Sequence, residues 1–376
     1  MSKKVLITAT VQSHICQFHK PLVAMLHQKG YEVHAAARNN LAEKNGLSID
    51  FVDKVYDVPF SRSPASKSNI KAYEELKKIM AENDYDIIHC NTPMGGVVTR
   101  LAARGLRKSG TKVIYTAHGF HFYKGAPLKN WLFYYPVEWL CSWFTDCIIT
   151  INTEDYQTAL KHFHSNSVSY IHGVGVDSKR YNTALDKNDD IRDELGYKKD
   201  DVIVLCTGEL NKNKNQRTVI EALAKIKDKN VKLILAGNGA EESNLMEQIS
   251  RLDLSDRARL VGYRTDLERF VKSSDIVVSM SRREGLGLNI IEAMMCGKPI
   301  VAAENRGHRD LINSGKGGFL VGANDYDALA DRIKVLCDNK ALCSEMGNYN
   351  LSAAGPFSME NIAGELQKIY GGLCNE

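Results

Sequence analysis

Residues 284–292 read EGLGLNIIE, with Glu284 and Glu292 on either side of a Gly-x-Gly turn. The apolar residues after the turn predict a helix over 290–295. Gly285 and Gly287 let the backbone approach a ligand closely, and free N–H groups at the start of the helix favour an anion. Glu292 lies about two turns into that helix, so it can face the same ligand as Glu284. The stretch therefore predicts an anion-binding helix start; the alternative is that both glutamates are solvated surface charges.

Short apolar runs alternate with helical patterns on both sides of this stretch. In the first half we expect strands at 5–9, 32–36, 86–90, 112–116 and 147–151, and helices at 21–30, 70–82 and 97–108. The pattern then restarts, with strands at 202–207, 232–236, 259–261, 276–279 and 299–303, and helices at 217–227, 242–252 and 290–295. This βαβα order predicts two α/β domains, each with a parallel sheet covered by helices on both faces.

The segment 171–177 reads IHGVGVD, and its two glycines suit a bend between the domains. Doubly wound domains usually bind their ligands at the carboxyl ends of the strands. Where two such domains face each other, the cleft between them is the default site. Functional motifs are therefore expected directly after strands.

Composition excludes several classes of protein. The chain has 376 residues, 44% of them hydrophobic and 25% charged, which is typical of a soluble globular protein. The net charge of +4 is too small to predict nucleic acid as a partner. Residues 1–175 contain 20 Lys/Arg and 14 Asp/Glu, a balance of +6, and the remainder contains 29 and 31, a balance of −2. The first half is thus the side more suited to an anionic partner, and no apolar run is long enough for an ordinary transmembrane helix.

The glutamate stretch resembles the E-x7-E motif of retaining family 4 glycosyltransferases, which have the GT-B fold. The similarity continues through 293–301 (AMMCGKPIV), 262–266 (GYRTD), Ser274-Asp275 and Ser281. The resemblance implies two Rossmann-like, doubly wound domains that face each other across a cleft. Residues 1–175 would form the acceptor-binding domain and 176–355 the nucleotide-sugar domain. The C-terminal residues 356–376, with a helix around 359–370, would pack back on the first domain.

The resemblance also implies roles for the residues of this motif. Glu292 would hold the nucleotide ribose, and Glu284 would contact hydroxyls of the donor sugar. Tyr263 and Arg264 would border the base. The backbone facing the sugar and the diphosphate would be that of Gly285, Leu286, Gly287 and Leu288.

A second motif, GELNKNKN at 208–215, follows the first strand of the second domain. The family pattern is Gly-Arg and then a Lys five residues later. Gly208 fits the Gly of this pattern and Lys214 fits the Lys. Lys214 would neutralise the negative charge of the departing diphosphate. Glu209 stands where the family has Arg, and a carboxylate there repels a diphosphate unless it pairs with a cation or turns away. Candidate replacement cations are Lys212, Arg282 and Arg283; the alternative is a solvated, lysine-rich turn.

The stretch YTAHGFHFY at 115–123 follows a strand of the first domain and resembles the His-bearing loop of family 4 enzymes that make surface polysaccharides. His118 would face the donor sugar at the reaction centre, whereas His121 more simply has a structural role.

After the first strand, many relatives have a Gly-rich loop, but this chain has Ser13-His14. Ser13 is expected to cap a helix and leave N–H groups free for phosphate, or to be a simple cap.

An aromatic segment and a basic helix in the first half suggest an acceptor surface. Trp and Tyr suit the membrane–water boundary, and Lys reaches anionic head groups. We therefore expect a membrane-surface or lipid-acceptor contact, with a buried aromatic helix or a dimer contact as alternatives. On the preceding helix, three arginines on one face could hold the pyrophosphate of a lipid carrier, or could be a solvated face. The residues concerned are Lys124, Lys129, Trp131, Trp139 and Trp143, and Arg100, Arg104 and Arg107.

Together these features and the resemblance predict a hexosyltransferase that moves a sugar from a nucleotide-diphosphate donor to an acceptor hydroxyl. The resemblance implies a UDP-sugar as the default donor and retention of configuration. No metal or other cofactor is expected, because Lys214 and helix N-termini would stabilise the leaving diphosphate. The expected acceptor is a lipid-linked saccharide, in capsular or exopolysaccharide synthesis, reached by a cytoplasmic enzyme bound peripherally to the inner face of the membrane. The alternatives are a GT-B UDP-sugar epimerase and a nucleotide-sugar-binding protein that has lost activity, as Glu209 would suggest.

Overall fold

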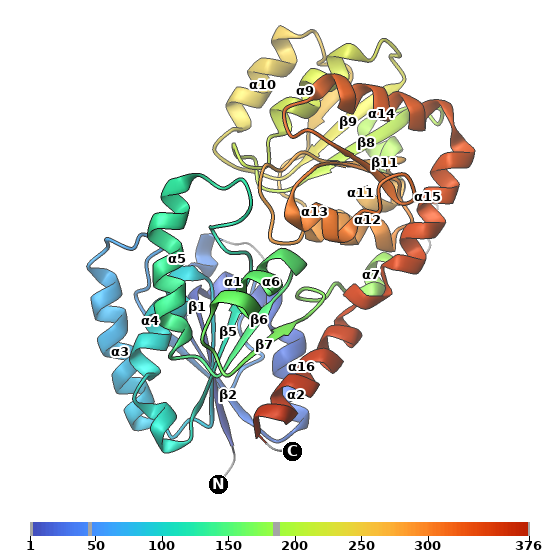
Figure 1. Ribbon diagram of the computed structural model, residues 1–376. Helices are drawn as coiled ribbons and strands as arrows, with labels where there is room; N and C mark the ends of the chain where they lie inside the picture. Colours follow the sequence, from blue (N-terminus) through green and yellow to red (C-terminus); the bar gives the residue numbers. More distant parts are fainter. Residues whose placement is uncertain (1–2, 44–46, 183–188, 375–376) are drawn as a thin grey trace. The chain divides into compact units, whose positions relative to one another are not determined.

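The computed structural model describes residues 3–43, 47–182 and 189–374, and the chain divides into two compact units (Figure 1). Unit 1 contains Met1–Gly175 and Met359–Glu376, and unit 2 contains Val176–Ser358. Each unit is a parallel sheet with helices on both faces, which explains why the strands read as nearly continuous apolar runs.

The described residues of unit 1 form a seven-stranded sheet with the order β3-β2-β1-β4-β5-β6-β7, in which every neighbouring pair is parallel. Its strands are β1 (Lys4–Val11), β2 (Glu32–Arg38), β3 (Lys54–Asp57), β4 (Ile87–Asn91), β5 (Lys112–Ala117), β6 (Cys147–Thr150) and β7 (Ser167–Tyr170). Its α-helices are α1 (Gln12–Phe18), α2 (Lys20–Gln28), α3 (Ser68–Glu82), α4 (Pro93–Ala103), α5 (Leu128–Ser142), α6 (Thr153–His162) and α16 (Met359–Cys374).

The two edge strands, β3 and β7, were not expected from the sequence. Both are four residues long and half-exposed, so they lack the buried apolar run that predicts a central strand. The helix expected over 97–108 instead begins at Pro93 and ends at Ala103, before a 3-10 turn at Leu106–Ser109. Its first turn contains Gly96, where a Cβ atom would lie 2.5 Å from the ring of Tyr115. Close packing on β5 therefore requires a glycine that weakens the helical pattern.

The C-terminal helix α16 packs on unit 1, beside α2 (Figure 1). The Tyr370 hydroxyl lies 2.7 Å from Nδ1 of His89, inside the unit. Near the middle of the helix, a carboxylate oxygen of Glu365 lies 2.6 Å from Nδ1 of His172. The last helix is thus part of the first sheet domain.

The described residues of unit 2 form a six-stranded parallel sheet with the order β10-β9-β8-β11-β12-β13. Its strands are β8 (Val202–Thr207), β9 (Val231–Ala236), β10 (Ala258–Leu260), β11 (Ile276–Ser279), β12 (Ile300–Ala303) and β13 (Gly318–Val321). Its α-helices are α7 (Ser178–Tyr181), α8 (Ile191–Leu195), α9 (Gln216–Lys225), α10 (Glu242–Arg251), α11 (Leu267–Ser273), α12 (Leu288–Met295), α13 (Arg306–Leu311), α14 (Tyr326–Asp338) and α15 (Lys340–Ala353).

Arg100 does not belong to an exposed basic face. Its side chain is completely buried, and its guanidinium lies 2.7 Å from a carboxylate oxygen of Glu138 on α5. The same guanidinium lies 3.9 Å from the ring centre of Tyr115, whose hydroxyl donates to Glu138. Arg104 is exposed, and Arg107 is bound to Asp146. The expectation that Arg100, Arg104 and Arg107 hold a pyrophosphate together is therefore wrong, because Arg100 turns inward to pair with Glu138 of α5 and Arg107 pairs with Asp146.

We expect Glu138→Ala to lower the free energy of unfolding of unit 1 by about 3–5 kcal/mol, because it leaves Arg100 charged, buried and unpaired. All three tryptophans lie in this unit, so denaturant unfolding followed by tryptophan fluorescence reports on it. The control Glu82→Ala removes an exposed pair with Lys78 and should cost less than about 0.5 kcal/mol. Equal effects of the two substitutions would show that the buried pair does not stabilise the unit.

Candidate active site

Two loops that carry predicted motifs lie side by side at the carboxyl edge of the unit 2 sheet. They follow β8 and β11, which are neighbours in the sheet. The N–H of Arg282 donates to the carbonyl of Asn213 at 2.8 Å, and the Asn213 side-chain amide donates to the carbonyl of Arg283 at 3.0 Å. The strand order therefore brings together segments about 70 residues apart in sequence.

Lys214 and Glu284 form an ion pair between these loops, with 2.6 Å between Nζ and a carboxylate oxygen. Burial would raise the pKa of Glu284, but the charge and hydrogen bond of Lys214 hold it below its ordinary value. Gly208 has a φ of +135°, and a Cβ atom there would lie 3.3 Å from Cε of Lys214. The pair thus presents an ionised carboxylate and an ammonium group at one point, over a glycine.

Glu292 lies on α12 and contacts Tyr181 of α7. Burial raises the pKa of the Glu292 carboxyl to about 7, and the hydrogen bond with Tyr181 opposes that shift. A carboxylate in such a place is suited to accept hydrogen bonds from ligand hydroxyls. Sequence reasoning missed Tyr181, because nothing near it in the chain indicates that α7 meets α12.

The Gly-x-Gly turn ends at Gly287, the N-cap of α12, where φ is +137° and no side chain caps the helix. The helix begins at Leu288, two residues before the predicted start. A Cβ atom on Gly287 would lie 3.3 Å from the ring of His308. In the first turn, Nδ2 of Asn289 is buried and has no hydrogen-bond partner among the described residues. An uncapped helix start and an unpartnered amide together make a donor-rich place for an anion or a hydroxyl.

Helix α13, which follows β12, supplies two further residues that sequence reasoning missed. His308 is fully buried, with Nδ1 2.7 Å from the carbonyl of Ala303. Burial lowers the pKa of His308 to about 4, so its ring is neutral at pH 7. Nε of Arg306 donates to the carbonyl of Glu284 at 3.3 Å, which helps to fix the loop. Both residues come shortly after the strand predicted at 299–303, and this position is the signal in the sequence that could have indicated them.

The other residues predicted to bind the nucleotide-sugar donor lie in different environments. They are Glu209, Tyr263 and Arg264. Glu209 is exposed, and among the described residues no cation lies within ion-pair distance of it; its backbone carbonyl accepts from Gln216. Its carboxylate therefore turns to solvent. Tyr263 is exposed, whereas the guanidinium of Arg264 makes two 2.8 Å bonds to the carboxylate of Asp266. Arg264 thus stabilises its own loop, whereas the ring of Tyr263 beside it is left accessible.

In unit 1, histidines gather at the carboxyl ends of β1, β4 and β5, which are neighbours. Nε2 of His118 lies 3.2 Å from Nε2 of His14 and 3.2 Å from the side-chain oxygen of Asn91. Burial lowers the pKa of His118 to about 4. At pH 7 its ring is therefore neutral and can exchange hydrogen bonds without carrying charge.

Ser13 does not cap a helix. Helix α1 begins at Gln12, its N-cap is Val11, and no side chain caps it. The N–H of Ser13 donates to Asn40, and the Asn40 amide donates back to the Ser13 hydroxyl at 2.9 Å. The expectation of a cap that leaves this N–H free is wrong, because the helix begins one residue earlier and Asn40 takes up both groups.

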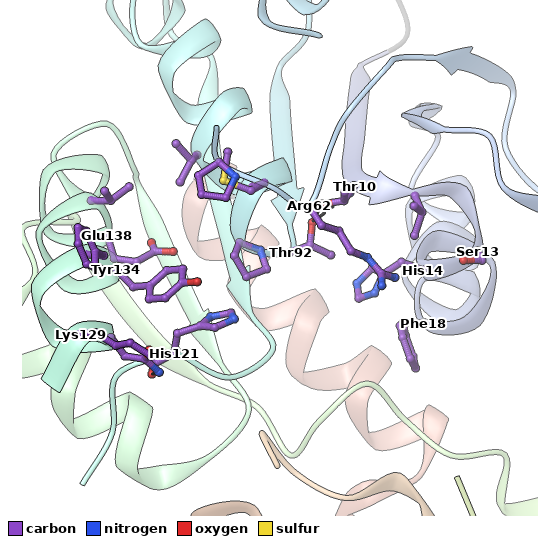
Figure 2. Close-up of a pocket in the computed structure, with 18 of the residues that line it drawn as sticks. Thr10, Ser13, His14, Phe18, Arg62, Thr92, His121, Lys129, Tyr134 and Glu138 are labelled. Atoms are coloured by element: carbon purple, nitrogen blue, oxygen red, sulfur yellow. Dashed lines mark hydrogen bonds between the residues drawn. The ribbon is translucent and has the colours of Figure 1, made fainter. Parts of the chain in front are cut away.

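Unit 1 contains a cavity of about 900 Å³ next to these histidines (Figure 2). Figure 2 shows Arg62 and His14 on one side of it, and Lys129, His121 and Tyr134 on the other. The ring of His121 stacks on that of Tyr134 at 4.5 Å, which supports its structural interpretation. Much of the wall is apolar, from Phe18, Met94, Val97, Phe133 and Val137. The cavity suits a ligand that has both an apolar part and an anionic part.

Helix α5 carries the aromatic segment on the surface of unit 1. Trp131, Trp139 and Trp143 are 36%, 38% and 51% exposed, so the interpretation as a buried aromatic helix is wrong. Lys124 and Lys129 are exposed near the start of the helix. No helix in the described ranges has the length and apolar character needed to cross a membrane.

Comparisons with known proteins agree with this geometry. Residues 187–352 match the family model for glycosyl transferases group 1, and residues 4–152 match the model for glycosyl transferase 4-like domains. A putative glycosyltransferase, EpsD of Bacillus subtilis, is 41% identical over 98% of this chain and 97% of its own length. The Escherichia coli UDP-Gal:alpha-D-GlcNAc-diphosphoundecaprenol alpha-1,3-galactosyltransferase is 26% identical over 88% of each chain.

Solved structures share the fold. HepE of Anabaena, crystallised with UDP and glucose, aligns with a TM-score of 0.80 and 21% identity over 98% of this chain and 100% of its own. WaaG, a glycosyltransferase of lipopolysaccharide biosynthesis, aligns with a TM-score of 0.76 and 14% identity over 97% of this chain and 99% of its own. These similarities confirm the predicted GT-B fold.

We expect Glu292→Gln to stabilise unit 2 more at pH 8 than at pH 5. The folded pKa of about 7 lies above the ordinary 4.5, so the folded wild type binds more protons between these values. The contribution of Glu292 to stability therefore falls as the pH rises through this window. An uncharged side chain avoids that loss, and the gain should differ between the two pH values by on the order of 2 kcal/mol.

Calorimetric unfolding of the wild type and the variant at both pH values measures this difference. The control is Glu247→Gln, at an exposed position on α10, for which the effect should be similar at pH 5 and pH 8. A Glu292→Gln effect that does not depend on pH would contradict the raised pKa.

Proposed function

Because the chain belongs to the group 1 glycosyl transferases, we propose that it transfers a sugar from a UDP-sugar to a hydroxyl of a lipid-linked saccharide, with retention of anomeric configuration, in the synthesis of a bacterial surface polysaccharide. The observation that carries the proposal is the cluster of Lys214, Glu284 and Glu292 at the carboxyl edge of the unit 2 sheet. Unit 2 would bind the donor, and unit 1 the acceptor.

Each group of the donor has a matching group in unit 2. The carboxyl of Glu292 would accept from the ribose hydroxyls, and the exposed ring of Tyr263 would border the base. The diphosphate would lie at the start of α12, where the backbone of residues 285–288 and the unpartnered amide of Asn289 supply donors. UDP is supported by the E. coli relative, whose name specifies UDP-Gal, and by HepE structures that contain UDP or UDP-glucose.

The chemistry depends on stabilising the UDP that leaves. Its new negative charge would be neutralised by Lys214 and by the N–H groups at the start of α12, so no metal is required. The diphosphate would share the ammonium now held by Glu284 and release carboxylate oxygens for the sugar hydroxyls. A donor phosphate oxygen would take the acceptor proton on the face that UDP leaves, which retains the configuration. His118, neutral at pH 7, would hydrogen-bond the sugar at the reaction centre.

The acceptor proposal is supported by unit 1. Its cavity combines the cations Arg62 and Lys129 with an apolar wall, which suits a diphosphate attached to a lipid. The apolar, aromatic surface of α5 and its lysines suit an anionic membrane surface. The name of the E. coli relative specifies an undecaprenyl diphosphate acceptor. We therefore propose a cytoplasmic enzyme bound peripherally at the inner face of the cell membrane.

A loss of activity has little support from Glu209. Its carboxylate turns to solvent, and the Lys214–Glu284 pair is formed beside it. The Arg of the family pattern is missing at that position, but Lys214 and the start of α12 would still offer positive charge and donors to a diphosphate. An epimerase would change the donor sugar without an acceptor, so product analysis in the absence of acceptor separates the two activities.

We expect UDP to raise the thermal stability of the protein with EDTA present, and GDP and ADP to have little effect. A ligand at 100 times its Kd adds about 2.7 kcal/mol to the free energy of unfolding. Glu292→Ala should abolish the shift, and Lys214→Ala should reduce it, while Glu247→Ala should retain it. A larger shift with GDP or ADP would overturn the choice of UDP, a shift that needs Mg²⁺ would overturn metal independence, and an unchanged shift in Glu292→Ala would overturn its ribose role.

We expect the protein to co-sediment with vesicles that contain anionic phospholipid, and Leu132→Ser combined with Leu140→Ser to weaken this about 10- to 100-fold. These side chains are 64% and 50% exposed on α5, and each would lose roughly 1 kcal/mol of apolar burial in the membrane. The matched control, Leu160→Ser, removes a leucine that is 55% exposed on α6. Equal binding by both variants would place the contact elsewhere.

A further inference from the structure

Three histidines of unit 1 meet beside the cavity. One ring nitrogen of each of His14, His19 and His118 lies within 4.8 Å of those of the other two. The ring centres are 4.6 Å apart for His14 and His118, 5.5 Å for His14 and His19, and 6.2 Å for His19 and His118. Within the described ranges, this is the one group of three or more His, Cys, Asp or Glu side chains that is suitably placed to hold a metal ion.

His19 has a nitrogen that the fold itself does not use. Its side chain is 4% exposed, and Nε2 has no hydrogen-bond partner among the described residues. A buried polar atom without a partner costs roughly 1–3 kcal/mol. The neighbouring His89 differs, because its two nitrogens lie 2.7 Å from the hydroxyls of Tyr370 and Thr116. The unsatisfied nitrogen is therefore specific to the cluster.

The spacing is close to that of a tetrahedral metal site. Zinc–nitrogen bonds of about 2.0–2.1 Å place neighbouring ligand nitrogens about 3.3–3.4 Å apart. The nitrogens of His14 and His118 are already 3.2 Å apart, and the third needs a shift of about 1–1.5 Å, which ring rotation supplies. An all-imidazole ligand set favours Zn²⁺, Cu²⁺ or Ni²⁺ over Mg²⁺ or Ca²⁺. His14 lines the cavity, so a fourth position would face it.

We propose that His14, His19 and His118 form a binding site for a divalent transition metal ion, with Zn²⁺ as the expected occupant, and that the occupied site inhibits sugar transfer. The proposal that a metal ion binds rests only on the geometry of the three histidines. Inhibition rests on the proposed function, because the metal would take up the nitrogen that His118 offers to the donor sugar. The site is thus a switch that responds to zinc, and transfer itself does not require the metal.

The direct test is calorimetric titration of the metal-free protein with ZnCl₂. We expect one ion per chain, and an affinity at least tenfold weaker in His19→Gln and in His118→Gln. His162→Gln, which alters an exposed histidine of the same unit, is the matched control and should bind as the wild type does. Co²⁺ in place of Zn²⁺ should give the visible absorption of a tetrahedral site in the wild type and the control, and lose it in the two cluster variants.

Three results would overturn the site: no binding at micromolar Zn²⁺, unchanged affinity in the cluster variants, or loss of binding in His162→Gln. Circular dichroism and thermal unfolding show whether each variant is folded, and His14→Gln, at a half-exposed position, replaces His19→Gln if that variant does not fold. Inhibition is tested separately in the transfer assay, as a loss of rate that EDTA reverses. Zinc that binds without inhibiting would overturn the link to His118, and failure to transfer any sugar would overturn the proposed function while leaving the calorimetric result decisive.

Discussion

The ion pair between Lys214 and Glu284 is the interaction on which the candidate donor site depends. It forms because β8 and β11 are neighbours, so that the loops after them end at the same edge of the sheet. Gly208 leaves room for the lysine, and Arg306, the first residue of α13, donates to the backbone carbonyl of Glu284. Without the pair, an ammonium and a carboxylate would each be partly buried and uncompensated. The proposed site for a diphosphate and a sugar is thus ordered by its own ion pair in the free protein.

A second ion pair has a comparable role in unit 1, but it is structural. Arg100 of α4 and Glu138 of α5 form an ion pair in the interior, and this pair holds α5 against α4. Cys141 and Ser142 of that helix are also buried, whereas its three tryptophans remain 36–51% exposed. The apolar surface therefore follows from how the helix is attached, and it is the surface that the proposed membrane contact uses.

In both units, groups that destabilise the folded protein lie where we propose a function. Glu292 is buried so far that its pKa rises to about 7, and Asn289 keeps an amide without a partner beside it. In unit 1 three imidazoles meet, and one of them keeps a buried nitrogen unpaired. Such groups destabilise the free protein and a ligand would satisfy them, which is the physical reason for proposing a nucleotide site in one unit and a metal site in the other.

The sequence by itself determined two parallel α/β domains, because apolar runs and glycine turns are local and their order is preserved along the chain; the family, the GT-B fold and the transferase class followed from the resemblance of its motifs to family 4 glycosyltransferases. It also located the motif loops at strand ends, including Glu284, Lys214 and His118. Only the tertiary structure decided which side chains meet: that Lys214 pairs with Glu284, that Tyr181 lies against Glu292, that Arg100 turns inward, and that Asn40 takes up Ser13. These contacts join residues far apart in the chain, and the direction of a side chain is set by packing between elements, which no local pattern encodes.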